Sequence, residues 1–168
     1  MLRHPQLAHF RAGMNHALQI QSRLLEELYT WLYPGDAKES VAVGSCSHEQ
    51  TCEQNIFVVR QVVPVTTDGY ISRQENIALW STADVADFIT MTAGRDQTPI
   101  AFHSHPSGQT VFSREDDVAD LTFHGELARR YLRRQFFASA IMLPDRTLIA
   151  RVVDPVQTFY QAEIRIDE

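Results

Sequence analysis

Hydrophobic residues recur along the chain with two different periods, which predict an alternation of helices and strands. Three helices are predicted: from Asn15 to about Tyr33, from Ser81 or Thr82 to Ala93, and from Ser113 or Arg114 to about Arg134. In the first, apolar residues recur at roughly helical spacing, with Asn15 as the predicted N-cap. The run Tyr33-Pro34-Gly35-Asp36 predicts the end of this helix.

Strands are predicted where Val, Ile and aromatic residues concentrate between turn signals. The predicted strands are Ser40 to Gly44, Ile56 to Val65, Ile71 to Trp80, Thr98 to His105, Phe136 to Leu143, Thr147 to Val153 and Thr158 to Ile166. Pro144-Asp145-Arg146 predicts a hairpin between the fifth and sixth of them. This order of elements predicts an α/β/α or α+β sandwich with a mixed β-sheet.

Length and composition indicate an ordinary globular domain. The 168 residues, 44% hydrophobic and 21% charged, fit one domain with a substantial core, and we expect residues 1–168 to form it. No apolar run approaches the length of a membrane span, and the N-terminus leads into no signal-peptide core. We therefore expect a soluble cytoplasmic protein that makes no membrane contact.

The formal net charge of −6 argues against a protein that binds nucleic acid by neutralising phosphates. The basic residues cluster at Arg129-Arg130 and Arg133-Arg134. At helical spacing they form either a cationic stripe for an acidic partner or a solvated face near a helix C-terminus, where the helix dipole favours cations. The solvated face is the preferred interpretation, and no nucleic-acid partner is expected.

The two cysteines, Cys46 and Cys52, do not make a disulfide framework, which is typical of a reducing compartment. With His48 between them they resemble part of a metal site. A fourth ligand and the usual ligand spacing are missing from this group. We therefore interpret these residues as part of a loop between strands.

The strongest chemical signal is the pair His103 and His105, followed by Ser113 and Asp116. Two imidazoles and one carboxylate can supply three zinc ligands and leave a fourth position open, as in catalytic zinc sites. Because side chains alternate along a strand, both histidines point to the same face. Asp116 falls in the first turn of the following helix, where the helix dipole favours a carboxylate.

Two features of this run have alternative explanations. Ser113 and Asp116 also match a helix capping box, which explains both without a metal but leaves the histidines unexplained. Asp117 competes with Asp116 as the third ligand. Adjacent helix positions differ by about 100°, so only one of the two can face an ion, and spacing does not decide which.

Metal-assisted hydrolysis also needs a group that accepts a proton from water. The upstream candidates are Glu39, Glu49 and Glu53. Glu39 directly precedes the apolar stretch around Val41 to Val43, and a carboxylate at the edge of a strand is well placed to be held rigidly. By composition alone, Glu39 fits a solvated acid at the end of a loop equally well.

Together, Glu39, His103-x-His105, Ser113 and Asp116 resemble the JAMM motif of the JAB/MPN metalloprotease family, Glu…His-x-His-x7-Ser-x2-Asp. The resemblance favours Asp116 over Asp117. It also favours Glu39, because family members usually place this glutamate at the start of a strand that ends in a small-residue turn, here Val43-Gly44. The residues after Glu39 depart from the commoner family pattern. The resemblance implies a single MPN/JAB domain with the cytidine-deaminase-like sandwich, a mixed sheet flanked by helices.

The resemblance also implies a role for each residue of the motif. His103, His105 and Asp116 would bind one zinc ion. Glu39 would position and deprotonate water and then protonate the leaving amine. Ser113 would donate a hydrogen bond to the oxyanion.

The implied activity is that of a zinc-dependent isopeptidase or peptidase, cleaving after the C-terminus of a ubiquitin-like protein in deconjugation or precursor processing. The chain is similar to short bacterial JAB proteins encoded beside E1-like and E2-like proteins. Some of those conjugation systems serve antiviral defence. The expected partners are therefore a ubiquitin-like protein or its conjugate and E1-like or E2-like proteins.

Three other hypotheses compete with this one. A RadC-like JAB domain linked to DNA metabolism shares the His-x-His-Pro-Ser-Gly run, but usually carries Asn and Pro where this chain has Ser104 and Phe112. A non-enzymatic MPN scaffold commonly loses ligands, whereas this chain keeps all of them. An anion site at the N-terminus of the Ser113 helix would need no metal. Candidate surfaces for gripping a substrate are Tyr70 to Trp80 and Phe159-Tyr160, although a core role is preferred for both.

Overall fold

The computed structural model describes residues 13–81, 97–131 and 135–168. The elements follow the order β1 (Asn15–Gln21), α1 (Ser22–Leu32), β2 (Val41–Gln50), β3 (Gln54–Pro64), a short 3₁₀ helix (Thr67–Gly69), β4 (Tyr70–Gln74), β5 (Ile77–Trp80), β6 (Gln97–Ser104), α3 (Arg114–Tyr131), β7 (Phe137–Met142), β8 (Leu148–Val153) and β9 (Phe159–Asp167). The predicted helix through Ala93 lies outside the described residues. Neither α1 nor α3 combines the length and apolarity that crossing a bilayer requires.

The main sheet is mixed, as predicted, and its strands close into a barrel in the order β1-β3-β2-β6-β7-β8-β9. Strand β1 is parallel to both β3 and β9, and β6 is parallel to β7. The other neighbours are antiparallel. The closed barrel differs from the sandwich that the sequence predicted. The barrel closes because β1 pairs with both β3 and β9, which would otherwise be the two edge strands of the sheet.

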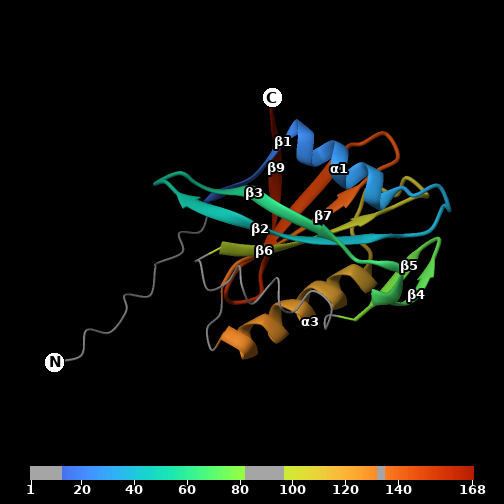
Figure 1. Ribbon diagram of the computed structural model, residues 1–168. Helices are drawn as coiled ribbons and strands as arrows, with labels where there is room; N and C mark the ends of the chain where they lie inside the picture. The colour runs from blue at the N-terminus through green and yellow to red at the C-terminus, as the bar shows by residue number, and fades with distance from the viewer. Residues whose placement is uncertain (1–12, 82–96, 132–134) are drawn as a thin grey trace.

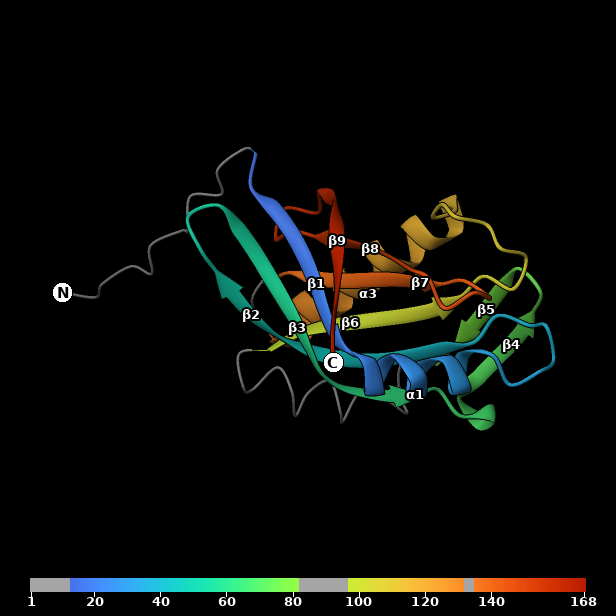
Figure 2. The ribbon, with the colours of Figure 1, turned by 90° about the horizontal axis from the view of Figure 1, so that it is seen from above.

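The two described helices lie on opposite sides of the strands, with α1 on one side and α3 on the other (Figures 1 and 2). Each side has its own buried cluster. Beneath α1 the core includes Leu28, Ala42 and Phe102, and beneath α3 it includes Val43 and Phe123. Alternation along β2 and β6 therefore sends successive side chains to different cores. The face toward α3 is the one on which His103 lies.

The predicted helix from Asn15 to Tyr33 is correct in its second half and wrong in its first. Residues 15–21 form β1, and the helix begins at Ser22 after Gln21, so Asn15 is not its N-cap. The helix ends at Leu32, as the turn-forming run predicted. Leu18 and Ile20 are fully buried in the strand. Pairing of β1 with β3 and β9 outweighs the local helical spacing, since tertiary contacts routinely override propensity.

Strand β2 is longer than the strand predicted from Ser40 to Gly44. It runs to Gln50, so Cys46 and His48 lie in β2 and the loop interpretation is wrong for them. Gly44 does not end the strand in a turn. A Cβ at Gly44 would lie 2.2 Å from the carbonyl oxygen of Gln61 on β3, so this glycine permits close approach of the two strands. A register irregularity follows it between Ser45 and Cys46.

The predicted strands from Ile56, Thr98, Phe136, Thr147 and Thr158 are present with small shifts of boundary, but the predicted single strand from Ile71 to Trp80 is wrong. The stretch from Ile71 to Trp80 forms a separate antiparallel hairpin, β4–β5, in place of one strand. Strands β7 and β8 form the predicted hairpin, and β9 follows as the last strand. Arg129 and Arg130 are exposed in the last turn of α3, whereas Arg133 and Arg134 lie outside the described residues.

Candidate metal centre

The two histidines converge at the end of β6. Their Nε2 atoms lie 3.0 Å apart, and His103 is paired with Val41 on β2 and with Ile141 on β7. Ser104 between them is fully buried, and its hydroxyl accepts a hydrogen bond from the backbone N–H of Ser40 at 2.9 Å. This contact ties the end of β6 to the segment that leads into β2, which carries Glu39.

Asp116 approaches the histidine pair from the first turn of α3. Its Oδ1 lies 3.2 Å from Nε2 of His103, and its Oδ2 lies 3.6 Å from Nε2 of His105. The ligand atoms of these three residues all lie within 4.8 Å of one another. The structure therefore brings the three predicted metal-binding residues into one cluster that could hold an ion.

Ser113 forms the predicted capping box at the start of α3. Its backbone N–H donates to Oδ2 of Asp116 at 2.6 Å, and its Oγ accepts from the backbone N–H of Asp116 at 3.1 Å. The capping box and the metal cluster therefore coexist, since Asp116 takes part in both. Because the Ser113 hydroxyl acts as an acceptor in the cap, its own proton is free to be donated to another group.

The orientation of His105 fits a metal ligand. Its Nδ1 lies 2.8 Å from the carbonyl oxygen of Gln109, which can only accept a hydrogen bond. Nδ1 therefore carries the proton, and neutral His105 directs the lone pair of Nε2 into the cluster. A backbone carbonyl on the outer nitrogen is the usual way in which proteins fix a metal-binding histidine. The donor set and this tautomer both fit a zinc ion.

The cluster perturbs the ionisation of its members. Burial favours neutral Asp116, but hydrogen bonds from His103 and His105 outweigh it and hold the pKa of the carboxyl far below its usual range. Burial lowers the pKa of His105, yet hydrogen bonds with Asp116 and the Gln109 carbonyl, together with the charge of Glu39, raise it overall. The site therefore favours the ionised form of the Asp116 carboxyl, which is the form that binds a metal ion.

Glu39 lies at the edge of the same cluster, just before β2. It is 8% exposed, and its Oε1 is 4.0 Å from Nε2 of His105. Burial raises the pKa of Glu39, and the nearby Asp116 charge raises it further, against the opposing effect of the two histidines. A carboxylate with a raised pKa is a better proton acceptor near neutral pH.

The competing carboxylates lie elsewhere. Val41, at the start of β2, is the residue paired with His103, so Glu49 lies toward the opposite end of the strand. Glu49 and Glu53 are both exposed. Asp117 faces away from the histidines and pairs with Nη1 of Arg151. Among these candidates, the structure brings only Glu39 and Asp116 to the histidine pair.

Two arginines that sequence reasoning missed support this arrangement. Nε of Arg73 on β4 donates to the carbonyl oxygen of Glu39 at 2.9 Å, and its guanidinium also binds Asp36 and Ser40. Arg151 on β8 binds Asp117 and Asp120 of α3. For Arg151 the sequence did contain a signal, because it is the one charged residue within the otherwise apolar run Leu148 to Val153.

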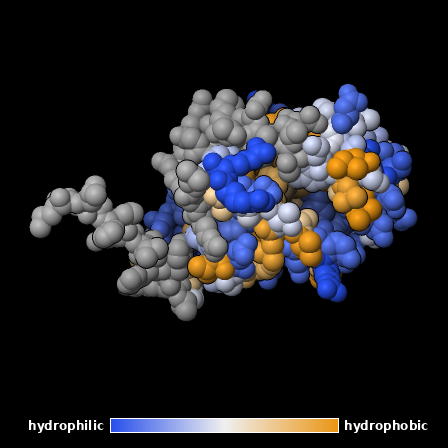
Figure 3. Space-filling model, turned by 90° about the horizontal axis from the view of Figure 1, so that it is seen from below, coloured by the Kyte–Doolittle hydropathy of each residue, from blue (hydrophilic) through white to orange (hydrophobic). Residues whose placement is uncertain are grey.

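An apolar cavity of about 600 Å³ adjoins the cluster between β5 and α3. Its lining includes Trp80 and Phe123, and it reaches Glu39, His103 and Asp116. Figure 3 shows hydrophobic side chains exposed on the face of the molecule that carries α3. Part of the predicted substrate surface, the end of Tyr70 to Trp80, therefore borders the candidate site.

The cysteine–histidine group forms no comparable cluster. Cys46 is fully buried, which raises the pKa of its thiol, while Cys52 is exposed in the turn after β2. The Nε2 atom of His48 is 2.8 Å from the side-chain oxygen of Asn55, and the ring stacks on Phe57. These contacts explain His48 as part of the packed sheet.

Comparisons with known proteins agree with this fold. A profile of the family described as "Prokaryotic homologs of the JAB domain" matches residues 21–147. The solution structure of protein DSY2949 from Desulfitobacterium hafniense is similar, with a TM-score of 0.57 and 14% identity over 90% of this chain and 93% of that one. At this identity the likeness extends to the fold alone. No curated protein matches the chain.

Proposed function

The chain belongs to the family of prokaryotic homologs of the JAB domain, and we propose that it is a zinc-dependent isopeptidase or peptidase. The convergence of His103, His105 and Asp116, with their ligand atoms within 4.8 Å of one another, carries the proposal. Three protein ligands leave a coordination position open, which is typical of catalytic zinc and not of structural zinc.

Each residue of the cluster has a task in acyl cleavage. His103, His105 and Asp116 would hold a zinc ion, which would supply Lewis-acid activation of water and of the scissile carbonyl. Glu39 accepts a proton from the attacking water and returns it to the leaving amine. The Ser113 hydroxyl donates a hydrogen bond to the carbonyl oxygen as negative charge develops there. The buried position and raised pKa of Glu39 support its role as the base.

The proposed substrate is the bond that follows the C-terminus of a ubiquitin-like protein, in deconjugation or precursor processing. The motif from Glu39 to Asp116 supports this substrate, as does the cavity that opens beside the cluster. E1-like and E2-like proteins would be partners in the same conjugation system, with antiviral defence as one such setting. Genes for these proteins beside the gene for this chain would support the assignment.

The test combines metal analysis with a cleavage assay. We expect about one zinc per purified chain, and cleavage of a ubiquitin-like fusion that chelator abolishes and added zinc restores. A chain that holds no stoichiometric metal would refute the zinc centre. A chain that holds zinc but cleaves no fusion from its own conjugation system would argue for a scaffold in place of an enzyme.

A further inference from the structure

We propose that Arg151 is a positioning residue for the metal centre, acting through Phe112 and the first turns of α3. The inference rests on the proposed zinc site and adds a residue that lies outside the motif. Arg151 lies on β8, and its side chain is almost completely buried. Its partners flank Ser113 and Asp116 on both sides along the chain.

The first set of contacts joins Arg151 to α3. Its Nε and Nη2 atoms both donate to Oδ2 of Asp120, at 2.9 and 2.7 Å, and Nη1 donates to Asp117. Asp117 directly follows Asp116, and Asp120 lies about one helical turn further on. The guanidinium therefore fixes the rotation of α3 that turns Asp116 toward the histidines.

The second set of contacts is aromatic. The guanidinium carbon of Arg151 lies 3.7 Å from the ring centre of Phe112 and 4.2 Å from that of Phe159. Phe112 directly precedes Ser113, and its ring meets the His103 ring edge-on with centres 6.0 Å apart. Stacking on Arg151 thus holds the end of the loop that supplies Ser113 and also limits movement of the His103 ring.

Stability alone does not account for an arginine at this place. A buried ion pair is costly to desolvate, and apolar residues of similar volume are often as stabilising. What a guanidinium adds is geometry, because its planar fork binds carboxylates in fixed directions while its faces stack on rings. Lysine cannot reproduce both contacts. The arginine therefore couples the orientation of α3 to that of Phe112 around the metal ligands.

The test measures zinc affinity by competition with a chromogenic chelator. It uses the full chain, wild type and variants. We expect Arg151→Lys and Phe112→Ala each to weaken zinc binding by about tenfold, as is typical when outer partners of metal ligands are lost. Phe112→Ala leaves the Arg151–Asp120 pair intact, so it tests the coupling even if Arg151→Lys fails to fold. The visible spectrum of the Co²⁺ form should change in both, since it reports ligand geometry.

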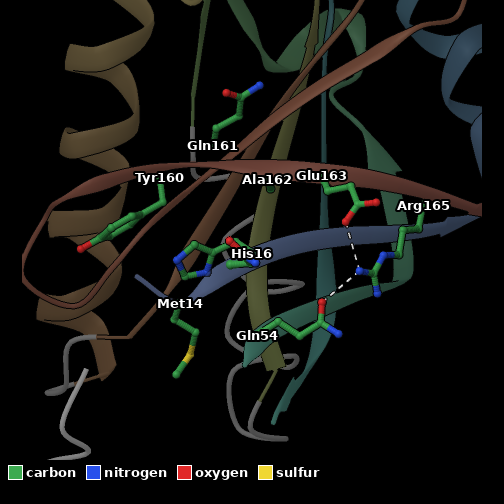
Figure 4. Close-up of a pocket in the computed structure, with 9 residues that line it drawn as sticks. Met14, His16, Gln54, Tyr160, Gln161, Ala162, Glu163 and Arg165 are labelled. Carbon is green, nitrogen blue, oxygen red and sulfur yellow. Dashed lines mark hydrogen bonds and ion pairs between the residues drawn. The ribbon is translucent and has the colours of Figure 1, made fainter. Parts of the chain in front are cut away.

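Arg165→Lys is the matched control. Arg165 lies on β9 and binds Gln54 and Glu163 (Figure 4), far from the cluster in the strand order of the barrel. This variant should keep wild-type zinc affinity and Co²⁺ spectrum. If folded Phe112→Ala had the zinc affinity and the Co²⁺ spectrum of the wild type, the positioning role of Arg151 would be overturned and the proposed function would be unaffected. A wild-type chain that binds no zinc would overturn both.

Discussion

At the scale of single residues, two adjacent carboxylates of α3 have different environments. Asp116 faces His103 and His105, whereas Asp117 faces Arg151. We therefore expect Asp116→Asn to lower zinc affinity by about 10²-fold or more, because losing a direct ligand should cost at least as much as losing an outer partner. Asp117→Asn should still bind one zinc. Metal analysis after dialysis checks both, and loss of zinc from the Asp117 variant alone would reverse the assignment.

In the proposed reaction, Glu39 is the residue whose mutation should separate catalysis from metal binding. It contacts the cluster from the side but lies outside the group of three ligands. Glu39→Gln should bind zinc normally and reduce kcat by about 10²–10⁴-fold, which is the usual contribution of a general base. Glu49→Gln and Glu53→Gln, at exposed positions, are the matched controls and should cleave like wild type. A fully active Glu39 variant would exclude it as the base.

At the scale of elements, the β4–β5 hairpin holds the segment that carries Glu39. The backbone N–H of Glu39 donates to the carbonyl of Gln74 at 2.8 Å, and its carbonyl accepts from Arg73. Arg73→Ala should lower kcat by about 10–10²-fold through misplacement of Glu39, while zinc affinity stays unchanged. Kinetics and chelator competition on the same preparations check this. Parallel loss of zinc and activity would indicate general disruption of the site.

Elements that could be predicted from the sequence are those with a strong local pattern. The histidine pair at the end of β6, the β7–β8 hairpin and the start of α3 follow from alternation, turn residues and a capping box. Arg73 and Arg151 could not be assigned in this way, because their partners come from distant segments. The choice of Asp116 over Asp117 rested on the family motif, and the Arg151 contact now gives it a physical reason.

At the scale of the whole molecule, closure of the barrel depends on β1, the element that the sequence predicted as helix. The apolar residues of β1 do have helical spacing, since buried Leu18 continues the apolar series of α1. The local sequence pattern carries no information on the pairing of β1 with β3 and β9. Parallel pairing joins residues far apart in the sequence, so only the assembled fold determines the conformation of this segment.

This closure also predicts how stability depends on pH. His16 lies on β1 in the pocket shown in Figure 4, and its ring is 4.9 Å from that of Tyr160 on β9. Burial lowers the pKa of His16 below its ordinary 6.5, and His48 lowers it further, against the opposing charge of Asp154. The unfolded chain therefore binds more protons than the folded chain as the pH falls below about 6.5. The His16 contribution to stability is complete above that pH and is lost on acidification through the folded pKa.

Replacing His16 should therefore reduce the acid sensitivity of the fold. We expect His16→Gln to lower Tm at pH 8, where the wild-type imidazole is neutral and packed, but to lose less Tm than wild type between pH 7 and pH 5. The comparison of slopes isolates His16, because the other ionisable side chains are the same in both proteins. Calorimetry across this range is the measurement. Equal slopes would mean that the junction of β1 with β9 tolerates a charged imidazole, so that closure of the barrel is not what makes the protein sensitive to acid.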